Sequence, residues 1–429
     1  MIAASRLPGA RAGVMAAEPL AVLALFVGRW LAGIVENFGA PFASQGAALL
    51  MLGLLALLFL RRMRLARDTA LFVAGALAWF ATGTLSLAAN PHVRMIDTLA
   101  LLSLLILYAL FANAAAIYLR NAAALRLLYR LFAAFVALGA MLSVWQVSTG
   151  HGFVEAGKFQ AQRAIGSDVH PVSFAIQTVA ALVGLEIARA RLGRRAGAAH
   201  SALMALGVLA LYLTYARTAW VMAALVVVAP LLLSGPMARR ILLGFGGLVA
   251  GTALLATSDR FSDLASLPVF LANFSLSDMV FDWRYIDNSI SWRIVNWSLG
   301  FHQALEQPIL GFGPGQSADS SYFSLEMHNI FLETFFEGGL FGLAAFLLVL
   351  AGLFRMHRRL PGATATDRYT RLLCNAFGLS LLLAVTFSTS FVDQLMSFLL
   401  YMLMLAAARA EAPCPPAGFA TWKNRLTGW

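Results

Sequence analysis

The sequence predicts an all-α protein that crosses a membrane about twelve times and carries one large loop late in the chain. Of its 429 residues, 60% are hydrophobic and only 12% are charged, about half the charged share of an ordinary soluble domain. The apolar residues form blocks of about 17–25, the length that a helix needs to cross about 30 Å of hydrocarbon. These blocks are continuous and do not alternate, which favours helices over a membrane barrel.

Twelve blocks qualify as predicted spans. They are residues 18–36, 45–60, 69–88, 96–118, 125–148, 171–189, 200–215, 218–234, 241–257, 329–354, 372–391 and 394–409. The chain therefore divides into spans 1–9 within 1–257, a large loop at 258–328 containing short amphipathic helices, spans 10–12 within 329–409, and a tail at 410–429.

Basic residues gather in alternate loops between these spans. They are Arg61, Arg62, Arg64, Arg67, Arg120, Arg126, Arg130, Arg189, Arg191, Arg194, Arg195, Arg239, Arg240, Arg355, Arg358, Arg359, Arg368 and Arg371. With twelve spans they all fall on one side, which is predicted to be cytoplasmic and to hold both termini. The net charge of +11 therefore indicates membrane topology and not a nucleic-acid partner.

Two loops on the opposite, outer side are predicted to be more than connectors. One covers 149–170, and the other, 258–328, has eight acidic residues against three arginines. Within the larger loop, segment 290–305 places Trp292 and Leu299 on one side of a helix. We expect an amphipathic helix at the outer interface, where tryptophan is favoured.

Arg217 is the first candidate for chemistry. It lies in TYARTAW, a turn between the seventh and eighth spans on the predicted outer side. The guanidinium of an arginine held there can bind phosphate oxygens with two parallel hydrogen bonds. The alternative is an arginine that reaches up to lipid headgroups without a catalytic role.

Arg293 is the second candidate, on the predicted amphipathic helix. It precedes the segment 308–315, PILGFGPG, whose glycines and prolines demand a turn and permit close backbone approach. This segment does not follow the strand–turn–helix pattern of a nucleotide-binding loop.

His328 is the third candidate, where the large loop enters the tenth span as EMHNIFLETFFEGGLFG. Helical spacing places His328, Leu332, Phe335 and Gly339 on one face. An imidazole at the membrane surface can accept a proton from a sugar hydroxyl. Taken alone, the residue is better explained as an interfacial histidine that makes a structural hydrogen bond, but it occurs together with the two arginine motifs.

Three further candidates lie elsewhere. Arg163 and His170 belong to the smaller outer loop, and Arg29 lies within the first span. For Arg29, a buried ion pair and a contact with substrate are both open. Charged residues at membrane depth are rare and tend to be functional.

No metal site or cysteine chemistry is expected. Glu333 and Glu337 lie one turn apart and Asp393 lies in the last outer turn, but no aspartate–x–aspartate motif presents a divalent ion. Cys374 and Cys414 lie in a predicted span and in the tail, so we expect neither a disulfide framework nor a thiol nucleophile.

Together these motifs resemble the O-antigen ligase and polymerase superfamily. The resemblance is sharpest over 290–345, where SWRIVNWSLGFHQALEQPILGFGPG and MHNIFLETFFEGGLFG look like the family's arginine–tryptophan helix, Pro-to-Gly turn and His-Asn signature. TYARTAW looks like its arginine turn before a helix. The resemblance rests on the order Arg217, Arg293, His328.

The resemblance implies an inverting glycosyl transfer from undecaprenyl diphosphate on the periplasmic side, without metal, nucleotide or other cofactor. In a ligase, the acceptor is a sugar hydroxyl of the lipid A–core. His328 would deprotonate that hydroxyl, while Arg217 and Arg293 would hold the diphosphate. The residues expected to assist in substrate binding are Arg163, His170 and Asn329.

Other functions remain open at this point. A polymerase of the same superfamily would move one carrier-linked repeat unit onto another, and a protein O-oligosaccharyltransferase would use a Ser or Thr hydroxyl. These three enzymes share their chemistry at the diphosphate. They differ in the groove that binds the acceptor, which one sequence does not reveal. A lipid-linked glycan flippase or transporter would instead place charged residues near the midplane of several helices.

Overall fold

The computed structural model describes most of the chain and is almost entirely helical there. The described residues are 17–40, 42–61, 64–91, 93, 95–154, 162–168, 170–233, 268–275, 289–321, 326–387 and 395–411. Within them, the only strands form one antiparallel pair of two residues each. The predicted all-α class is therefore confirmed.

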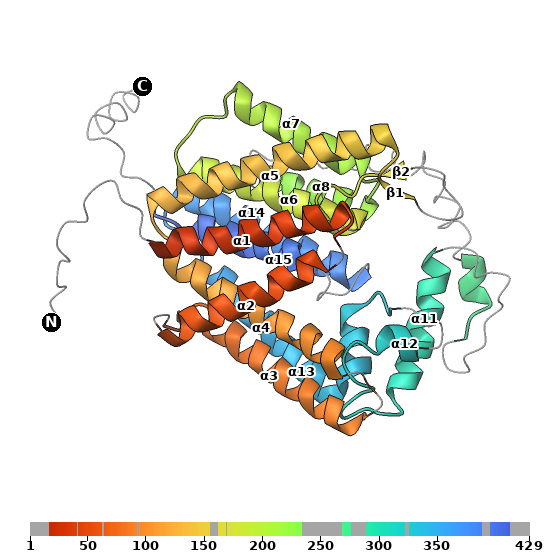
Figure 1. The fold of residues 1–429 in the computed structure, drawn as a ribbon. Coiled ribbons are helices and arrows are strands. Elements are labelled where there is room, and N and C mark those ends of the chain that lie inside the picture. Colours follow the sequence, from red (N-terminus) through yellow and green to blue (C-terminus); the bar gives the residue numbers. More distant parts are fainter. Residues whose placement is uncertain are drawn as a thin grey trace.

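The helices follow the predicted spans closely (Figure 1). The elements are α1 (Ala17–Asn37), α2 (Ala43–Arg61), α3 (Ala70–Ala89), α4 (Met95–Tyr118), α5 (Ala122–Thr149), β1 (Phe153–Val154), β2 (Gln162–Arg163), α6 (Pro171–Arg191), α7 (Ala198–Leu213), α8 (Arg217–Leu233), α11 (Ser289–Ala304), α12 (Ser317–Ser320), α13 (Ile330–Arg358), α14 (Ala365–Phe387) and α15 (Leu395–Arg409). The predicted span 241–257 lies outside the described residues.

Six helices in the described part are long and apolar enough to cross a membrane, namely α1, α3, α5, α6, α13 and α14. Five shorter apolar helices belong to α2, α4, α7, α8 and α15. These helices agree with a multi-pass membrane protein, and the count of twelve spans stays a prediction.

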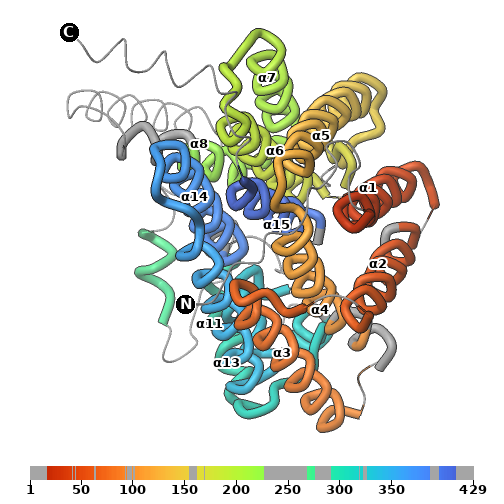
Figure 2. The backbone as a smooth tube through the Cα atoms, turned by 90° about the vertical axis from the view of Figure 1, so that its left-hand side faces the viewer, coloured from red at the N-terminus to blue at the C-terminus, as the bar shows by residue number. Residues whose placement is uncertain are grey.

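The core of the bundle is built around α6 and α15. Nearly every described side chain of these two helices is buried, and they pack against each other. Figure 2 shows α15 near the middle of the bundle, with the other helices around it. By contrast, α1 and α2 expose many apolar side chains, as helices do when lipid is their solvent.

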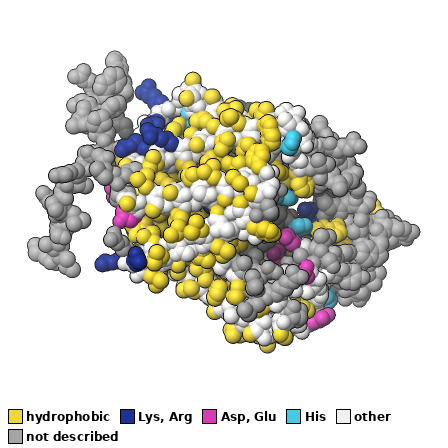
Figure 3. All heavy atoms as spheres, in the orientation of Figure 1, with side chains coloured by type: hydrophobic (Ala, Val, Ile, Leu, Met, Phe, Trp, Pro, Cys, Tyr) yellow, Lys and Arg dark blue, Asp and Glu magenta, His cyan; other side chains and the backbone are white. Residues whose placement is uncertain are grey.

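The loops that carry the predicted cytoplasmic arginines meet at one end of the bundle, which we call the basic end. Arg359 pairs with Asp68 at 2.7 Å and joins the end of α13 to the α2–α3 loop. The N–H of Glu411 donates to the carbonyl of Arg120 at 2.7 Å, which joins the chain after α15 to the α4–α5 turn. An ion pair also joins the end of α6 to the start of α14. Figure 3 shows Lys and Arg side chains gathered at this end.

The opposite end, which we call the loop end, is formed by the ends of α1, α3 and α7, the β1–β2 pair, α11 and α12 (Figure 1). Asn37, the last residue of α1, donates to the carbonyl of Asp168 at 2.8 Å. The two sets of loops predicted from charge are therefore separated in space. Which end faces the cytoplasm stays a prediction.

Segment 308–315 forms backbone hydrogen bonds with α13 on both sides of a break in that helix. The helix is interrupted at Gly339, with φ 61° and ψ −156°. The N–H groups of Phe312 and Gly313 donate to carbonyls in the turn before the break, at 2.9 and 3.0 Å, and the N–H of the residue after it donates to Pro308 at 2.8 Å. These contacts satisfy backbone groups that the break would otherwise leave unpaired in the bundle. The close backbone approach predicted from the glycines is confirmed.

Substitution of Gly339 by alanine is expected to destabilise the protein much more than the same change at Gly338. A Cβ at Gly339 would lie 2.3 Å from the backbone of Ile309, whereas a Cβ at Gly338 would meet nothing within 4 Å. The strained backbone alone adds about 1–3 kcal/mol for a residue other than glycine. Melting temperatures of the two variants in the same detergent check this, and equal values would contradict the role of the break.

Candidate functional site

His328 occupies a strained turn at the entry to α13. Its φ is 49°, in the left-handed region that residues other than glycine seldom adopt, although histidine does so more often than most. The next residue, Asn329, caps the helix, and its side-chain oxygen accepts the N–H groups of Phe331 and Leu332 at 3.1 Å each. The turn therefore fixes the backbone from which the imidazole projects. Backbone strain of this kind often marks a functional residue.

Helix α11 holds the segment in front of α13. The indole Nε1 of Trp297 donates to the carbonyl of Met327 at 2.7 Å, and a second side chain of α11 donates to the same segment at 3.1 Å. The ring of Trp292 meets the ring of His328 edge to face, with centroids 5.5 Å apart. The imidazole is therefore half-buried against an indole, in a position set by several contacts.

This packing brings His328 next to the turn of α11 that carries Arg293. Arg293 directly follows Trp292 in the chain and is half-buried. The helix predicted over 290–305 is confirmed as α11 (Ser289–Ala304), and its placement at a membrane surface stays a prediction. Two of the three predicted catalytic residues thus lie in one local unit.

Arg163 and Arg217 form a second unit at the α7–α8 turn. The Nε of Arg163 donates to the carbonyl of Thr214 at 2.9 Å, and a backbone hydrogen bond of 2.9 Å beside it joins the same two segments. Tyr215 within the turn has φ 50°, and Arg217 follows as the exposed first residue of α8. The smaller predicted loop therefore packs on the turn that presents Arg217.

Both units lie at the loop end of the bundle (Figure 1). On the face drawn in Figure 3, histidine and acidic side chains gather at this end, with far less blue than at the basic end. The shared end satisfies the first requirement for a common site. That the two units converge on one cavity stays a prediction.

His170 contributes to the structure of the smaller loop. It is the N-cap of α6, and its Nδ1 accepts the N–H of Val172 at 3.2 Å. Its ring also meets the ring of Phe153 at 5.7 Å between centroids. These contacts explain the residue as a helix cap, and its predicted role in binding substrate is a proposal.

Arg29 interacts electrostatically with Asp168 and Glu36. Asp168 itself accepts a hydrogen bond from the side chain of Gln177 on α6, and its backbone carbonyl is held by the end of α1. Both interpretations of Arg29, a buried ion pair and contact with substrate, stay predictions. The effect of this network is to fix the smaller loop between α1 and α6.

The paired glutamates of α13 are buried, with Glu333 at 7% and Glu337 at 6% exposure. A carboxylate oxygen of Glu337 accepts the N–H of Ser317 at 3.2 Å. In the part of the chain that the structure describes, no three His, Cys, Asp or Glu side chains are grouped as metal ligands. Asp393 lies outside the described residues.

Two residues that support the site were not predicted from the sequence. Gln146 is 3% exposed and its side-chain oxygen accepts the N–H groups of Ile165 and Gly166 at 3.0 and 2.7 Å, which holds the smaller loop. The side-chain amide of Asn90 donates to the carbonyl of Gly311 at 3.0 Å and so holds segment 308–315 in place. Both are polar side chains near the outer end of a predicted span, and this feature of the sequence could have identified them.

Comparison with known families finds one match. Residues 202–347 match the family model described as O-antigen ligase. This stretch begins in α7 and ends in α13, so it contains the three predicted catalytic residues, whereas Arg163 and His170 precede it. No curated protein matches the chain.

The match supports a membrane glycosyl transfer of the O-antigen ligase or polymerase type, with a lipid-linked glycan as substrate. The resemblance predicted from the order of three motifs is thereby confirmed. Residues 202–347 of this chain are therefore similar to the O-antigen ligase family.

Proposed function

We propose that the protein transfers a glycan from undecaprenyl diphosphate to a sugar hydroxyl of the lipid A–core, at the periplasmic face of the bacterial inner membrane. The observation that carries this proposal is the packing of His328, in a left-handed turn, against Trp292 beside Arg293. The family match over the same residues supports it.

In the proposed reaction, the acceptor hydroxyl attacks the anomeric carbon of the carrier-linked glycan. His328 takes the hydroxyl proton as the new C–O bond forms, and the bond from the anomeric carbon to the diphosphate oxygen breaks. The electron pair leaves with undecaprenyl diphosphate, and the imidazolium later returns its proton to water. Attack opposite the leaving group inverts the anomeric centre.

The arginines would stabilise the charge that develops on the diphosphate. A guanidinium stays charged at any physiological pH and matches two phosphate oxygens at once. In a site shielded from water, such stabilisation is usually the largest single contribution to catalysis. Arg217 and Arg293 would supply it from two different helices, with Arg163 adding charge beside Arg217.

Reconstitution of the full chain with carrier-linked glycan and lipid A–core tests the proposal directly. Glycan attached to lipid A–core, without added nucleotide, supports the ligase. Longer glycan chains that remain on the carrier would identify the polymerase alternative. Carrier lipid moved across the vesicle membrane with no new linkage would overturn the enzyme and favour a transporter.

Transfer is expected to proceed at an unchanged rate when EDTA replaces divalent cations. The proposed positive charge comes from arginine side chains, and an ion is not required to bind the leaving diphosphate. Initial rates with EDTA and with added Mg²⁺ measure this. A rate that collapses in EDTA and recovers with Mg²⁺ would contradict the arginine clamp.

A further inference from the structure

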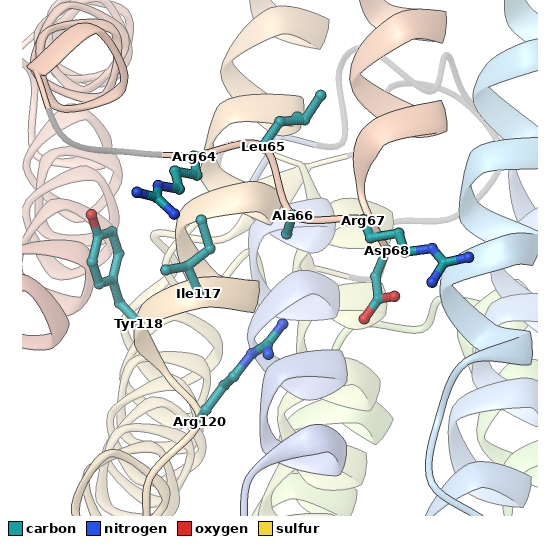
Figure 4. A pocket seen from close by; sticks show the side chains of 8 residues that line it. All are labelled: Arg64, Leu65, Ala66, Arg67, Asp68, Ile117, Tyr118 and Arg120. Atoms are coloured by element: carbon teal, nitrogen blue, oxygen red, sulfur yellow. The ribbon is translucent and has the colours of Figure 1, made fainter. Parts of the chain in front are cut away.

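A cavity of about 510 Å³ lies at the basic end, far from the proposed site, where the α2–α3 loop faces the end of α4 (Figure 4). The side chains that matter for its chemistry are Arg64, Leu65, Arg67, Ile117, Tyr118 and Arg120. We propose that this cavity binds the phosphate of an anionic phospholipid headgroup, as a site separate from the glycan-transfer chemistry.

The charge of the cavity is positive. Arg64, Arg67 and Arg120 line it, and no ion pair in the described part of the chain involves any of them. Among the described residues of the lining, the one carboxylate belongs to Asp68, which is already paired at 2.7 Å with Arg359. The three guanidinium groups therefore attract an anion that no described side chain provides.

The cavity is rigid on its loop side because a buried asparagine ties down the loop. Asn113 is fully buried in α4, and its side-chain oxygen accepts the N–H of Ala66 at 2.8 Å and the hydroxyl of Thr69 at 2.7 Å. Its amide nitrogen donates to the carbonyl of Arg64 at 3.1 Å. A loop that served only to carry positive charge would not need this clamp. Ordering the loop in advance lowers the entropic cost of binding a ligand.

The α4 side of the cavity is fixed as well. The Nε of Arg120 donates to the carbonyl of Ala116 in the last turn of α4, and its own carbonyl accepts the N–H of Glu411. Figure 4 shows the side chain of Arg120 lying between the end of α4 and the loop above it. The guanidinium is thus held against the last turn of α4.

The remaining lining suits a lipid headgroup better than a soluble anion. Tyr118 can donate its hydroxyl to a phosphate oxygen, while Leu65 and Ile117 provide apolar surface for the first carbons of the lipid. The cavity also lies where α2 and α4 end, at Arg61 and Tyr118, the depth at which headgroups meet a spanning helix. Basic pockets between helix ends on the cytoplasmic side bind anionic lipids in this way.

Native mass spectrometry of the full chain in neutral detergent, titrated with phosphatidylglycerol or phosphatidylcholine, tests the proposal. We expect the wild type to bind phosphatidylglycerol selectively, and the double variant Arg64→Gln, Arg120→Gln to bind it about thirtyfold more weakly, about fivefold for each arginine. The matched control is Arg126→Gln, because Arg126 is an exposed arginine of α5 at the same end and outside the cavity lining. It is expected to bind like the wild type.

Further arms distinguish the outcomes. Tyr118→Phe removes a single oxygen and is expected to weaken binding a few-fold, which keeps the proposal testable if the double variant does not fold. Equal affinity in the double variant and the Arg126→Gln control would overturn the site. Displacement of phosphatidylglycerol by inorganic phosphate would overturn the lipid assignment and indicate a soluble phosphate ligand.

Discussion

Replacement of His328 by asparagine is expected to slow glycan transfer by at least about a hundredfold, the usual effect of losing a general base. Asparagine tolerates the left-handed φ of 49° found at this position, so the turn into α13 should persist. Its amide cannot take the proton of the acceptor hydroxyl. The initial rate in proteoliposomes, at saturating carrier-linked glycan, measures the effect.

His302→Asn is the matched control for this prediction. His302 lies in the last turn of α11, at the same end of the bundle, and is exposed. We expect this variant to transfer glycan at the wild-type rate. If His328→Asn also transferred at that rate, the imidazole would serve only to pack against Trp292, and the base assignment would fail.

Replacement of Arg217 by alanine is expected to lower the rate of transfer by about 10²–10³, the range seen when one group that stabilises a developing negative charge is removed. Arg217→Lys should recover only part of this loss, because lysine keeps the charge but not the paired donors that fit two phosphate oxygens. Rates for the three proteins under identical conditions measure both effects.

A suitable control for Arg217 is Arg130→Ala, another exposed arginine, on α5 toward the basic end. It should leave the rate of transfer unchanged. The exposure of Arg217 also fits the alternative of an arginine that only contacts lipid headgroups. Wild-type transfer by Arg217→Ala would favour that alternative and remove the diphosphate clamp.

The elements with strong periodicity were predicted closely. The helix expected over 290–305 is α11 (Ser289–Ala304), because aromatic and aliphatic residues recur there at helical spacing. The largest difference is at α14, which was expected to begin at 372 and begins at Ala365. Thr364 and Asp367 exchange hydrogen bonds of 2.9 and 3.0 Å, a capping box that starts the helix before its apolar part.

The contacts that position the candidate site could not be predicted from local patterns. The glycine-rich segment 308–315 was predicted to be a turn. In the structure its backbone forms hydrogen bonds with α13 around the break at Gly339. The sequence of an apolar helix does not indicate which distant segment will form hydrogen bonds with its interrupted backbone. The clamp of Asn113 on the α2–α3 loop is also a contact between residues far apart in the chain. A single sequence identifies the polar residue in a span but not its partner.

The central claim is that Arg217, Arg293 and His328, which belong to two local units at one end of the bundle, act on one lipid diphosphate. A structure of the full chain with undecaprenyl diphosphate bound tests it most directly. We expect phosphate oxygens within hydrogen-bonding distance of both guanidinium groups, with the imidazole of His328 bordering the same cavity. A diphosphate bound at the basic end, or one that contacts neither arginine, would contradict the account.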